Sequence, residues 1–165
     1  MTKDEFAARV IALQDTLYRV SYSLLPNPCD QDDAVQETIR IALQKRETLR
    51  EERYLQTWII RILIHECYGL MRKKARELPS EEIQVMAPPT SDKAVVEALV
   101  KLDKRFRLPL VLHHIEGYTT REVAQILRVP EGTIKGRLVR GRDLLKKILV
   151  KEGTVYEGAE QTYLR

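Results

Sequence analysis

Apolar residues recur at steps of three and four along nearly the whole chain, and this spacing restricts the possible folds more than any other feature. Such a period places apolar side chains along one face of an α-helix. The first stripe predicts one long amphipathic helix, which Pro26 and Pro28 end. It consists of Phe6, Val10, Leu13, Leu17, Val20 and Leu24. The pattern therefore predicts an all-α protein.

Two further helices are expected before residue 77. The second begins around Asp30 to Asp33, where carboxylates suit the positive end of the helix dipole. Its apolar stripe is Val35, Ile39, Ala42 and Leu43. The third helix is predicted from about Tyr54 to Arg76. Its inward residues are Leu55, Ile59, Ile62, Leu63 and Leu70.

The period then fails between Glu77 and Asp92. This segment, ELPSEEIQVMAPPTSD, contains three prolines, four acids and no basic residue, and predicts an extended, flexible linker. A new helix begins with the stripe Val95, Leu99 and Leu102, and Pro109 is expected as an early residue of the next. A chain of 165 residues is long enough for two small domains with modest cores. We therefore predict two helical domains, 1–76 and 94–150, with a linker over 77–93 and a tail over 151–165.

The segment from Thr119 to Arg142 predicts that the second domain contains a helix-turn-helix. Thr119 and Glu122 form a capping box, because each side chain can bond the other's free backbone amide where a helix starts. Pro130 cannot continue that helix, so the chain breaks and restarts near Glu131. The buried side of the second helix is marked by Ile134, Leu138, Gly141 and Leu145. In such motifs the second helix lies in the DNA major groove.

The local charge supports this interpretation. Between Arg128 and Lys147 there are seven Lys or Arg residues against two acids, Glu131 and Asp143. A clustered positive charge is the electrostatic footprint of a nucleic-acid partner. The alternative is an ordinary helical hairpin with a solvated basic face.

The first domain carries opposite charges at two places. The segment Asp30 to Glu37 contains four acids and no base, whereas Arg72 to Arg76 has four bases in five residues. DNA phosphate repels an acidic helix, so the acidic segment suits a protein partner and the basic one a nucleic acid. Each segment taken alone is equally consistent with a solvated helix end.

Catalysis, a metal site and a cofactor are not expected. His113, His114 and Glu116 form the nearest constellation, but adjacent helix residues point apart. Cys29 and Cys67 have no metal-ligand spacing with the histidines and are expected to be reduced, packed residues. No apolar run approaches the roughly 20 residues that a membrane span needs, and the N-terminus has no secretory pattern. A soluble, cytoplasmic protein is therefore expected.

Three motifs, in this order, match one known family over about residues 10 to 150. Asp32 to Glu37, DDAVQE, resembles an acidic Glu-Asp-x-x-Gln-Glu motif, and Thr57 to Ile62, TWIIRI, is similar to Thr-Trp-Leu-x-Arg-Ile. Gly132 to Arg142, GTIKGRLVRGR, is close to Gly-Thr-Val-Lys-Ser-Arg-Leu-x-Arg-Ala-Arg. The family is that of the extracytoplasmic-function (ECF) sigma factors, the small promoter-recognition subunits of bacterial RNA polymerase.

The resemblance implies an alternative sigma factor that binds core RNA polymerase and directs promoter-specific initiation. Docking on the clamp helices of the β′ subunit is expected from Asp32, Asp33, Gln36 and Glu37. The minus-ten element of promoter DNA is expected to be held and melted by Trp58, Arg61, His65, Tyr68, Arg72, Lys73 and Lys74. The minus-thirty-five element is expected to contact Thr120, Thr133, Lys135, Gly136, Arg137, Val139, Arg140 and Arg142. A further expected partner is an anti-sigma protein, in the membrane or outside it.

The side of its helix on which each DNA-contacting residue is expected predicts its role. Lys135, Gly136, Val139 and Arg140 are expected toward base edges, with Arg137 and Arg142 toward phosphate. An unstacked base needs an aromatic or apolar wall, for which Trp58 and Tyr68 are candidates. Core packing is the alternative for Trp58. The alternative function, a free-standing helix-turn-helix regulator, predicts a regulatory domain in place of an acidic helix followed by a basic one.

Five positions depart from the family pattern. His65 and Gly69 stand where the family usually has Asn and Asp. Arg128 stands where the turn commonly has Gly, and a left-handed conformation there destabilises a non-glycine residue by roughly 1 to 2 kcal/mol. Gly136 and Gly141 replace Ser and Ala, each destabilising a helix by roughly 0.5 to 1 kcal/mol relative to alanine. At Gly136 the missing side chain permits a closer approach of the backbone to the bases.

Overall fold

The structure is a computed structural model that describes residues 1–77 and 93–151 of the chain. These residues form helices and no strand, so the all-α prediction is confirmed. The chain divides into two compact units, Met1–Gln84 and Val85–Arg165. Most of the predicted linker and tail, residues 78–92 and 152–165, lies outside the described residues.

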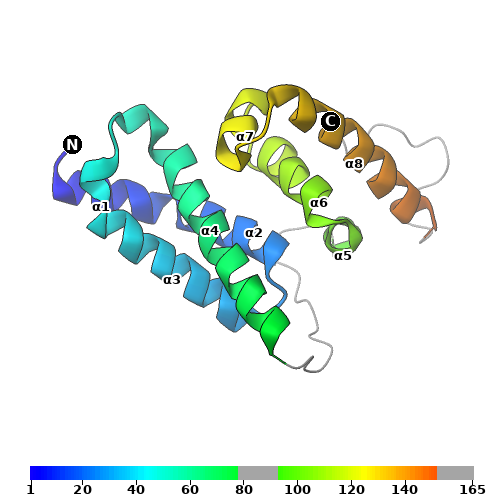
Figure 1. Cartoon of the computed structure of the whole chain (residues 1–165), viewed down its shortest axis with the longest axis horizontal. Helices are drawn as coiled ribbons and strands as arrows, with labels where there is room; N and C mark the ends of the chain where they lie inside the picture. Colours follow the sequence, from blue (N-terminus) through cyan, green and yellow to red (C-terminus); the bar gives the residue numbers. More distant parts are fainter. Residues whose placement is uncertain (78–92, 152–165) are drawn as a thin grey trace. The chain divides into compact units, whose positions relative to one another are not determined.

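The first unit is built on two long helices that lie side by side in opposite directions (Figure 1). They are α3 (Pro28–Gln44) and α4 (Leu55–Arg76), and the 3-10 turns η1 (Arg46–Thr48) and η2 (Glu52–Tyr54) connect them. The shorter α1 (Lys3–Ala12) and α2 (Gln14–Leu24) pack against this pair. The core contains the fully buried Leu17, Val20, Val35, Leu55, Ile59 and Leu63.

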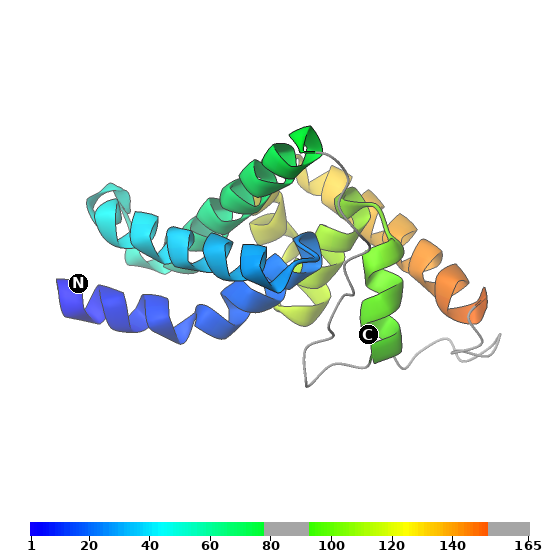
Figure 2. The same cartoon turned by 90° about the horizontal axis from the view of Figure 1, so that it is seen from below.

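The prediction of one long first helix is wrong, because the helix is broken at Leu13 (Figure 2). The Leu13 amide donates to the Val10 carbonyl at 3.1 Å. A bond over three residues tightens the last turn of a helix and changes the chain direction. The break lets the two halves pack differently: α1 packs mainly on α3 and reaches α4 through Phe6 and Trp58, whereas α2 packs on both α3 and α4. The apolar period continues across the break, so the sequence pattern does not reveal it.

The second helix begins earlier than predicted. The Asn27 side chain accepts a hydrogen bond from the Cys29 amide at 2.8 Å, and Pro28 is the first helical residue. Proline suits this position because its φ angle is already helical and its missing N–H is not needed there. Pro28 therefore starts α3 as well as ending the preceding segment.

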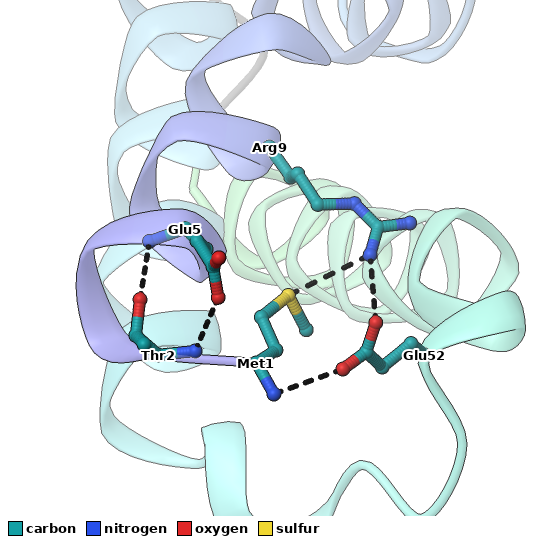
Figure 3. Close-up of polar contacts among 5 residues, drawn as sticks. All are labelled: Met1, Thr2, Glu5, Arg9 and Glu52. Atoms are coloured by element: carbon teal, nitrogen blue, oxygen red, sulfur yellow. Dashed lines mark hydrogen bonds and ion pairs between the residues drawn. The ribbon is translucent and has the colours of Figure 1, made fainter.

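The start of α1 is held by two linked contacts (Figure 3). Thr2 and Glu5 form a capping box with bonds of 2.7 and 3.2 Å. Glu52 of η2 pairs with the Met1 ammonium at 3.0 Å and with Arg9 Nη1 at 3.4 Å. The hydrogen bond and charge of Glu52 raise the pKa of that ammonium. These contacts connect α1 to the turn that leads into α4.

The second unit packs around its last and longest helix. The helices α5 (Lys93–Lys101), α6 (Lys104–Leu110) and α7 (Thr120–Leu127) all contact α8 (Glu131–Lys151), and α6 lies alongside α8 (Figure 1). Gly141 makes this close crossing possible. A Cβ atom added to Gly141 would lie 3.2 Å from Leu110 Cδ1 and 3.3 Å from Phe106 Cβ.

Pro109 is not an early helical residue as predicted, since it lies inside α6 and near its end. Its missing N–H cannot bond the carbonyl four residues earlier. The helix continues beyond it as a π-helical turn, η3 (Val111–Ile115). Leu108, Pro109 and Leu110 are all buried, so burial of this apolar run outweighs the local preference of proline for a helix start.

Candidate nucleic-acid and protein interfaces

The helix-turn-helix predicted from the sequence is confirmed in its geometry. The capping box before α7 forms both bonds: the Thr119 amide donates to Glu122 Oε2 at 2.8 Å, and the Glu122 amide donates to Thr119 Oγ1 at 3.1 Å. Val123, Ala124 and Ile126 are buried on the side of α7 that faces the core. The helix α7 packs directly against α8.

The turn between α7 and α8 contains Arg128 in the left-handed conformation, with φ 56° and ψ 46°. Among the residues that the structure describes, no other non-glycine residue has a positive φ. The Val129 amide donates to the Ala124 carbonyl at 3.2 Å, which closes the end of α7. Arg128 thus occupies the glycine position of the family pattern with the backbone geometry that glycine favours. The turn therefore has its left-handed geometry although this strains the backbone of Arg128.

The exposed face of α8 carries the residues expected to meet base edges. Lys135, Gly136, Val139 and Arg140 are exposed, and Val139 exposes 54% of its surface although it is apolar. The two arginines expected at phosphate, Arg137 and Arg142, are half-buried, as is Thr133. The buried side is Ile134, Leu138, Gly141, Leu145 and Leu149. An exposed apolar side chain between basic ones is suited to a thymine methyl group in the major groove.

Three of the expected contact residues already have partners within the protein. Thr120 Oγ1 donates to Glu131 Oε1 at 2.7 Å, and Lys135 Nζ lies 3.7 Å from the same oxygen. The Arg140 guanidinium carbon lies 5.9 Å from the centre of the Phe106 ring. Glu131, which is not among the residues predicted from the sequence, therefore joins the beginnings of α7 and α8. Its signal in the sequence was its place in the first turn of the second helix, where an acid is favoured.

The helix α4 brings five of the expected minus-ten residues onto one face. Trp58, Arg61, His65, Tyr68 and Arg72 follow one another at steps of three and four, which is the spacing of one helical face. Arg61, His65 and Arg72 are exposed, whereas Trp58 and Tyr68 are half-buried.

Trp58 and Lys74 also make contacts within the first unit. The Trp58 ring meets the Phe6 ring edge-on, with centroids 6.2 Å apart, so part of its surface belongs to the core. Lys74 lies two positions, or about 200° around the helix, from Arg72. Its Nζ atom is 2.5 Å from Asp30 Oδ2, so the Lys74 ammonium and the Asp30 carboxylate form an ion pair. Lys74 therefore connects the end of α4 to the start of α3.

The acidic residues of α3 lie at the surface, as an interface would require. Asp32, Asp33 and Gln36 are exposed, and Glu37 is half-buried. Asp33, Gln36 and Glu37 line one side of a groove of about 430 Å³ between α3 and α4. The other lining residues are Ala34, Arg40, Glu66 and Leu70. Glu66 and Leu70 were not predicted from the sequence as interface residues, although they are one helical turn apart on α4.

Two of these acids are held by neighbours. The Tyr18 hydroxyl donates to Asp32 Oδ1, and this bond raises the pKa of the phenol. Arg40 donates to Glu37 through Nε at 2.9 Å and Nη2 at 2.6 Å, and this pairing lowers the pKa of the carboxyl group. Asp33 and Gln36 are both exposed at the groove, and Gln36 also hydrogen-bonds to Tyr18, so we expect Asp33 to be the motif residue most available to a partner.

Two all-α units, one with a basic helix-turn-helix, define a DNA-binding protein of transcription. Comparison with known proteins agrees: the chain matches the family model "Sigma-70 region 2" over residues 10–77 and "Sigma-70, region 4" over residues 92–145. The chain belongs to the ECF sigma factors. It is an alternative sigma factor, which binds core RNA polymerase and directs transcription initiation at specific promoters.

Individual relatives match over most of their length. RNA polymerase sigma factor SigV of Bacillus subtilis is 31% identical over 141 residues, which cover 82% of this chain and 85% of SigV. ECF RNA polymerase sigma factor SigW of the same organism is 26% identical, covering 89% of this chain and 90% of SigW. The solved structure of the sigma factor RpoE, in complex with the anti-sigma factor NepR from Bartonella quintana, matches with a TM-score of 0.80 at 25% identity. That match covers 88% of this chain and 97% of RpoE.

Proposed function

We propose that this sigma factor binds its promoter through two helix surfaces and the polymerase through a third. The observation that carries the proposal is the separation of charge in the first unit. The acids of α3 border the groove, whereas Arg61, His65 and Arg72 are exposed along one face of α4. Opposite charges on separate surfaces suit a protein partner and a nucleic acid held at the same time.

Docking on the clamp helices of the β′ subunit is assigned to Asp32, Asp33, Gln36 and Glu37. Asp33 and Gln36 are exposed at the rim of the groove. Arginine or lysine side chains of the partner are the natural ligands of this carboxylate and amide pair, because charge-assisted bonds are stronger than neutral ones. Tyr18 and Arg40 then act as positioning residues, since they hold Asp32 and Glu37.

Minus-ten recognition is assigned to the face of α4. Trp58 and Tyr68 are the candidates for stacking against an unpaired base, and the Trp58 ring also contacts Phe6. Arg61, Arg72 and Lys73 supply positive charge for the strand backbone. Lys74 contributes charge nearby, while its ion pair with Asp30 fixes the end of the helix.

Minus-thirty-five recognition is assigned to α8, with its first three turns in the major groove. Arg140 and Val139 are the base readers, and Arg137 is a phosphate contact. Thr120, at the start of α7, is held near α8 by Glu131. It lies where a phosphate contact by the first helix of the motif is expected.

Three further features belong to the proposal. The protein acts in the cytoplasm, where core polymerase is found, and none of the helices over residues 1–77 and 93–151 meets the length and apolar character of a membrane span. It catalyses no reaction: His113 Nδ1 is 2.7 Å from the Tyr118 carbonyl, a structural contact. An anti-sigma protein holds it inactive. RpoE was solved with such a partner, NepR, and the chain shares its fold.

Run-off transcription with core polymerase tests the docking assignment. The double variant Asp33→Ala, Glu37→Ala should lose polymerase association and promoter-directed transcripts. Lys135→Ala, which changes a charge in the other unit, is the matched control and should retain association. If the double variant still binds core polymerase as tightly as the unaltered protein, the docking surface is wrongly assigned.

The recognition helix is tested by two arginine variants that have different expected signatures. Arg140→Ala should weaken binding by roughly 1 to 3 kcal/mol and relax the preference at one promoter position. Arg137→Ala should weaken all sequences alike and lower the salt dependence of binding, because a phosphate contact releases counterions. Equal behaviour of the two variants would refute the assignment of faces on α8.

A further inference from the structure

An aromatic ring of α6 contacts one of the residues assigned to promoter recognition on α8. The Arg140 guanidinium carbon lies 5.9 Å from the centre of the Phe106 ring. At such a distance the electron-rich face of an aromatic ring attracts a guanidinium group. Arg140 is assigned above to a base edge, whereas Phe106 has no part in that assignment. The contact therefore connects the second unit's core to its DNA-reading surface.

The Phe106 ring is fixed in place by the packing of α6 on α8. Phe106 is buried, with 7% of its surface exposed. A Cβ atom added to Gly141 would lie 3.3 Å from Phe106 Cβ, so glycine at this position lets the two helices approach closely. Arg140 directly precedes Gly141 in the sequence. The close approach at Gly141 therefore brings a rigidly held ring next to the Arg140 side chain.

Arg140, in contrast, is exposed at the surface of α8. Arginine has many rotamers, and ordering its side chain against a base is entropically unfavourable. Side chains on a helix lean toward the preceding turn, which for Arg140 contains Gly136. A Cβ atom added to Gly136 would meet nothing within 4 Å, so the space on that side is open. The ring of Phe106 is thus a fixed support beside a side chain that otherwise has considerable freedom.

A second arginine lies near the same ring. The Arg105 guanidinium carbon is 4.8 Å from the centre of the Phe106 ring. Two guanidinium groups near one ring repel each other, which would weaken the contact with Arg140. Arg105 Nε, however, lies 3.8 Å from Asp103 Oδ1, and this carboxylate offsets part of its charge. The ring therefore remains attractive to Arg140 in the presence of Arg105.

We propose that Phe106 is a positioning residue for minus-thirty-five recognition, because its ring holds the Arg140 guanidinium near the conformation in which it contacts a base. The inference rests on the assignment of Arg140 as a base reader. A side chain that is ordered beforehand loses less freedom on binding, so the contact favours the correct base over the others. A cation–π contact at an exposed site corresponds to a change of roughly two- to five-fold in affinity. A ring that drew Arg140 away from DNA would have the opposite effect.

Base preference of the holoenzyme tests the inference. The full-length protein is combined with core polymerase, and bound DNA is selected from duplexes whose upstream promoter element is randomised. Arg140→Ala identifies the position that Arg140 reads. Phe106→Leu should lower the preference at that position by roughly two- to five-fold and leave the other positions unchanged. Phe106→Tyr, which keeps an aromatic ring, should retain the preference. Leu110→Val, which alters packing at the same crossing but changes no ring, is the matched control and should retain it too.

The double variant shows whether Phe106 acts through Arg140. Adding Phe106→Leu to Arg140→Ala should cause no further change in base preference. An unchanged or sharper preference in Phe106→Leu would overturn the inference, and so would an equal loss in Leu110→Val. Should Phe106→Leu fail to fold, Phe106→Met gives the same comparison, because its flexible side chain fills irregular space. If Arg140→Ala itself relaxes no position, the base-reading role of Arg140 is wrong and the inference fails with it; a loss in Arg140→Ala alone overturns only the role of Phe106.

Discussion

Replacing Arg128 by glycine should stabilise the helix-turn-helix. Arg128 has φ 56° and ψ 46°, a left-handed conformation that destabilises a non-glycine residue by about 1 to 2 kcal/mol. Glycine adopts it without strain but loses more backbone entropy on folding, which offsets about 0.5 to 1 kcal/mol of the gain. The expected net change is an increase of about 0.5 to 1 kcal/mol in the free energy of unfolding. For a unit of this size that corresponds to a rise in Tm of about 2 to 8 °C.

Native-state hydrogen exchange is the appropriate assay, because it reports on each unit of the full-length protein separately. The slowest amides of α8, around Leu138, should exchange more slowly in Arg128→Gly, and those of α4 should be unchanged. Arg128→Ala is the matched control: it removes the exposed side chain but retains the Cβ atom and therefore the strain. If Arg128→Ala stabilises α8 as much as Arg128→Gly does, the left-handed backbone is not the cause and the reasoning is refuted.

Three further predictions concern local packing and chemistry. Gly141→Ala should destabilise the second unit by about 1 to 2 kcal/mol, because the new Cβ would lie 3.2 Å from a buried side chain; Gly136→Ala meets open space and should stabilise it by about 0.5 to 1 kcal/mol. Thermal unfolding of both variants checks the opposite signs. Thr119→Ala removes the α7 capping box and should lower the free energy of unfolding of the second unit by about 1 kcal/mol. A fully retained Tm would contradict this. At pH 8 a thiol reagent should modify the exposed Cys29 and spare Cys67, because burial raises the pKa of that thiol to about 12 and leaves little thiolate; mass spectrometry of the peptides identifies the labelled residue.

Features that depend on neighbouring residues in the sequence could be predicted without a structure. The capping box of Thr119 and Glu122 forms as expected, because its two bonds involve residues only three positions apart. The buried side of α8 follows from its period, and Ile134 and Leu138 are buried. The family pattern has Gly at the position of Arg128, which indicates a left-handed turn, and the structure contains one.

Features that depend on burial or on distant residues could not be predicted in this way. Pro109 lies near the end of α6 because an apolar run around it is buried, and this burial outweighs the local preference of proline. Leu13 breaks the first helix although the apolar period continues through it. Lys74 belongs to a run of basic residues, yet it pairs with Asp30, which is more than forty positions away. No local pattern contains such a partner.

Periodicity, capping and charge are local properties of the chain, so they predict a helical protein in two parts, one of which reads DNA. Which charged residues are available to partners depends instead on how the helices pack. Asp32 is hydrogen-bonded to Tyr18 and Glu37 to Arg40, whereas Asp33 remains exposed at the rim of the groove between α3 and α4. The physical reason is that hydrogen bonds and ion pairs form between groups that are close in space, and packing of the helices alone sets those distances.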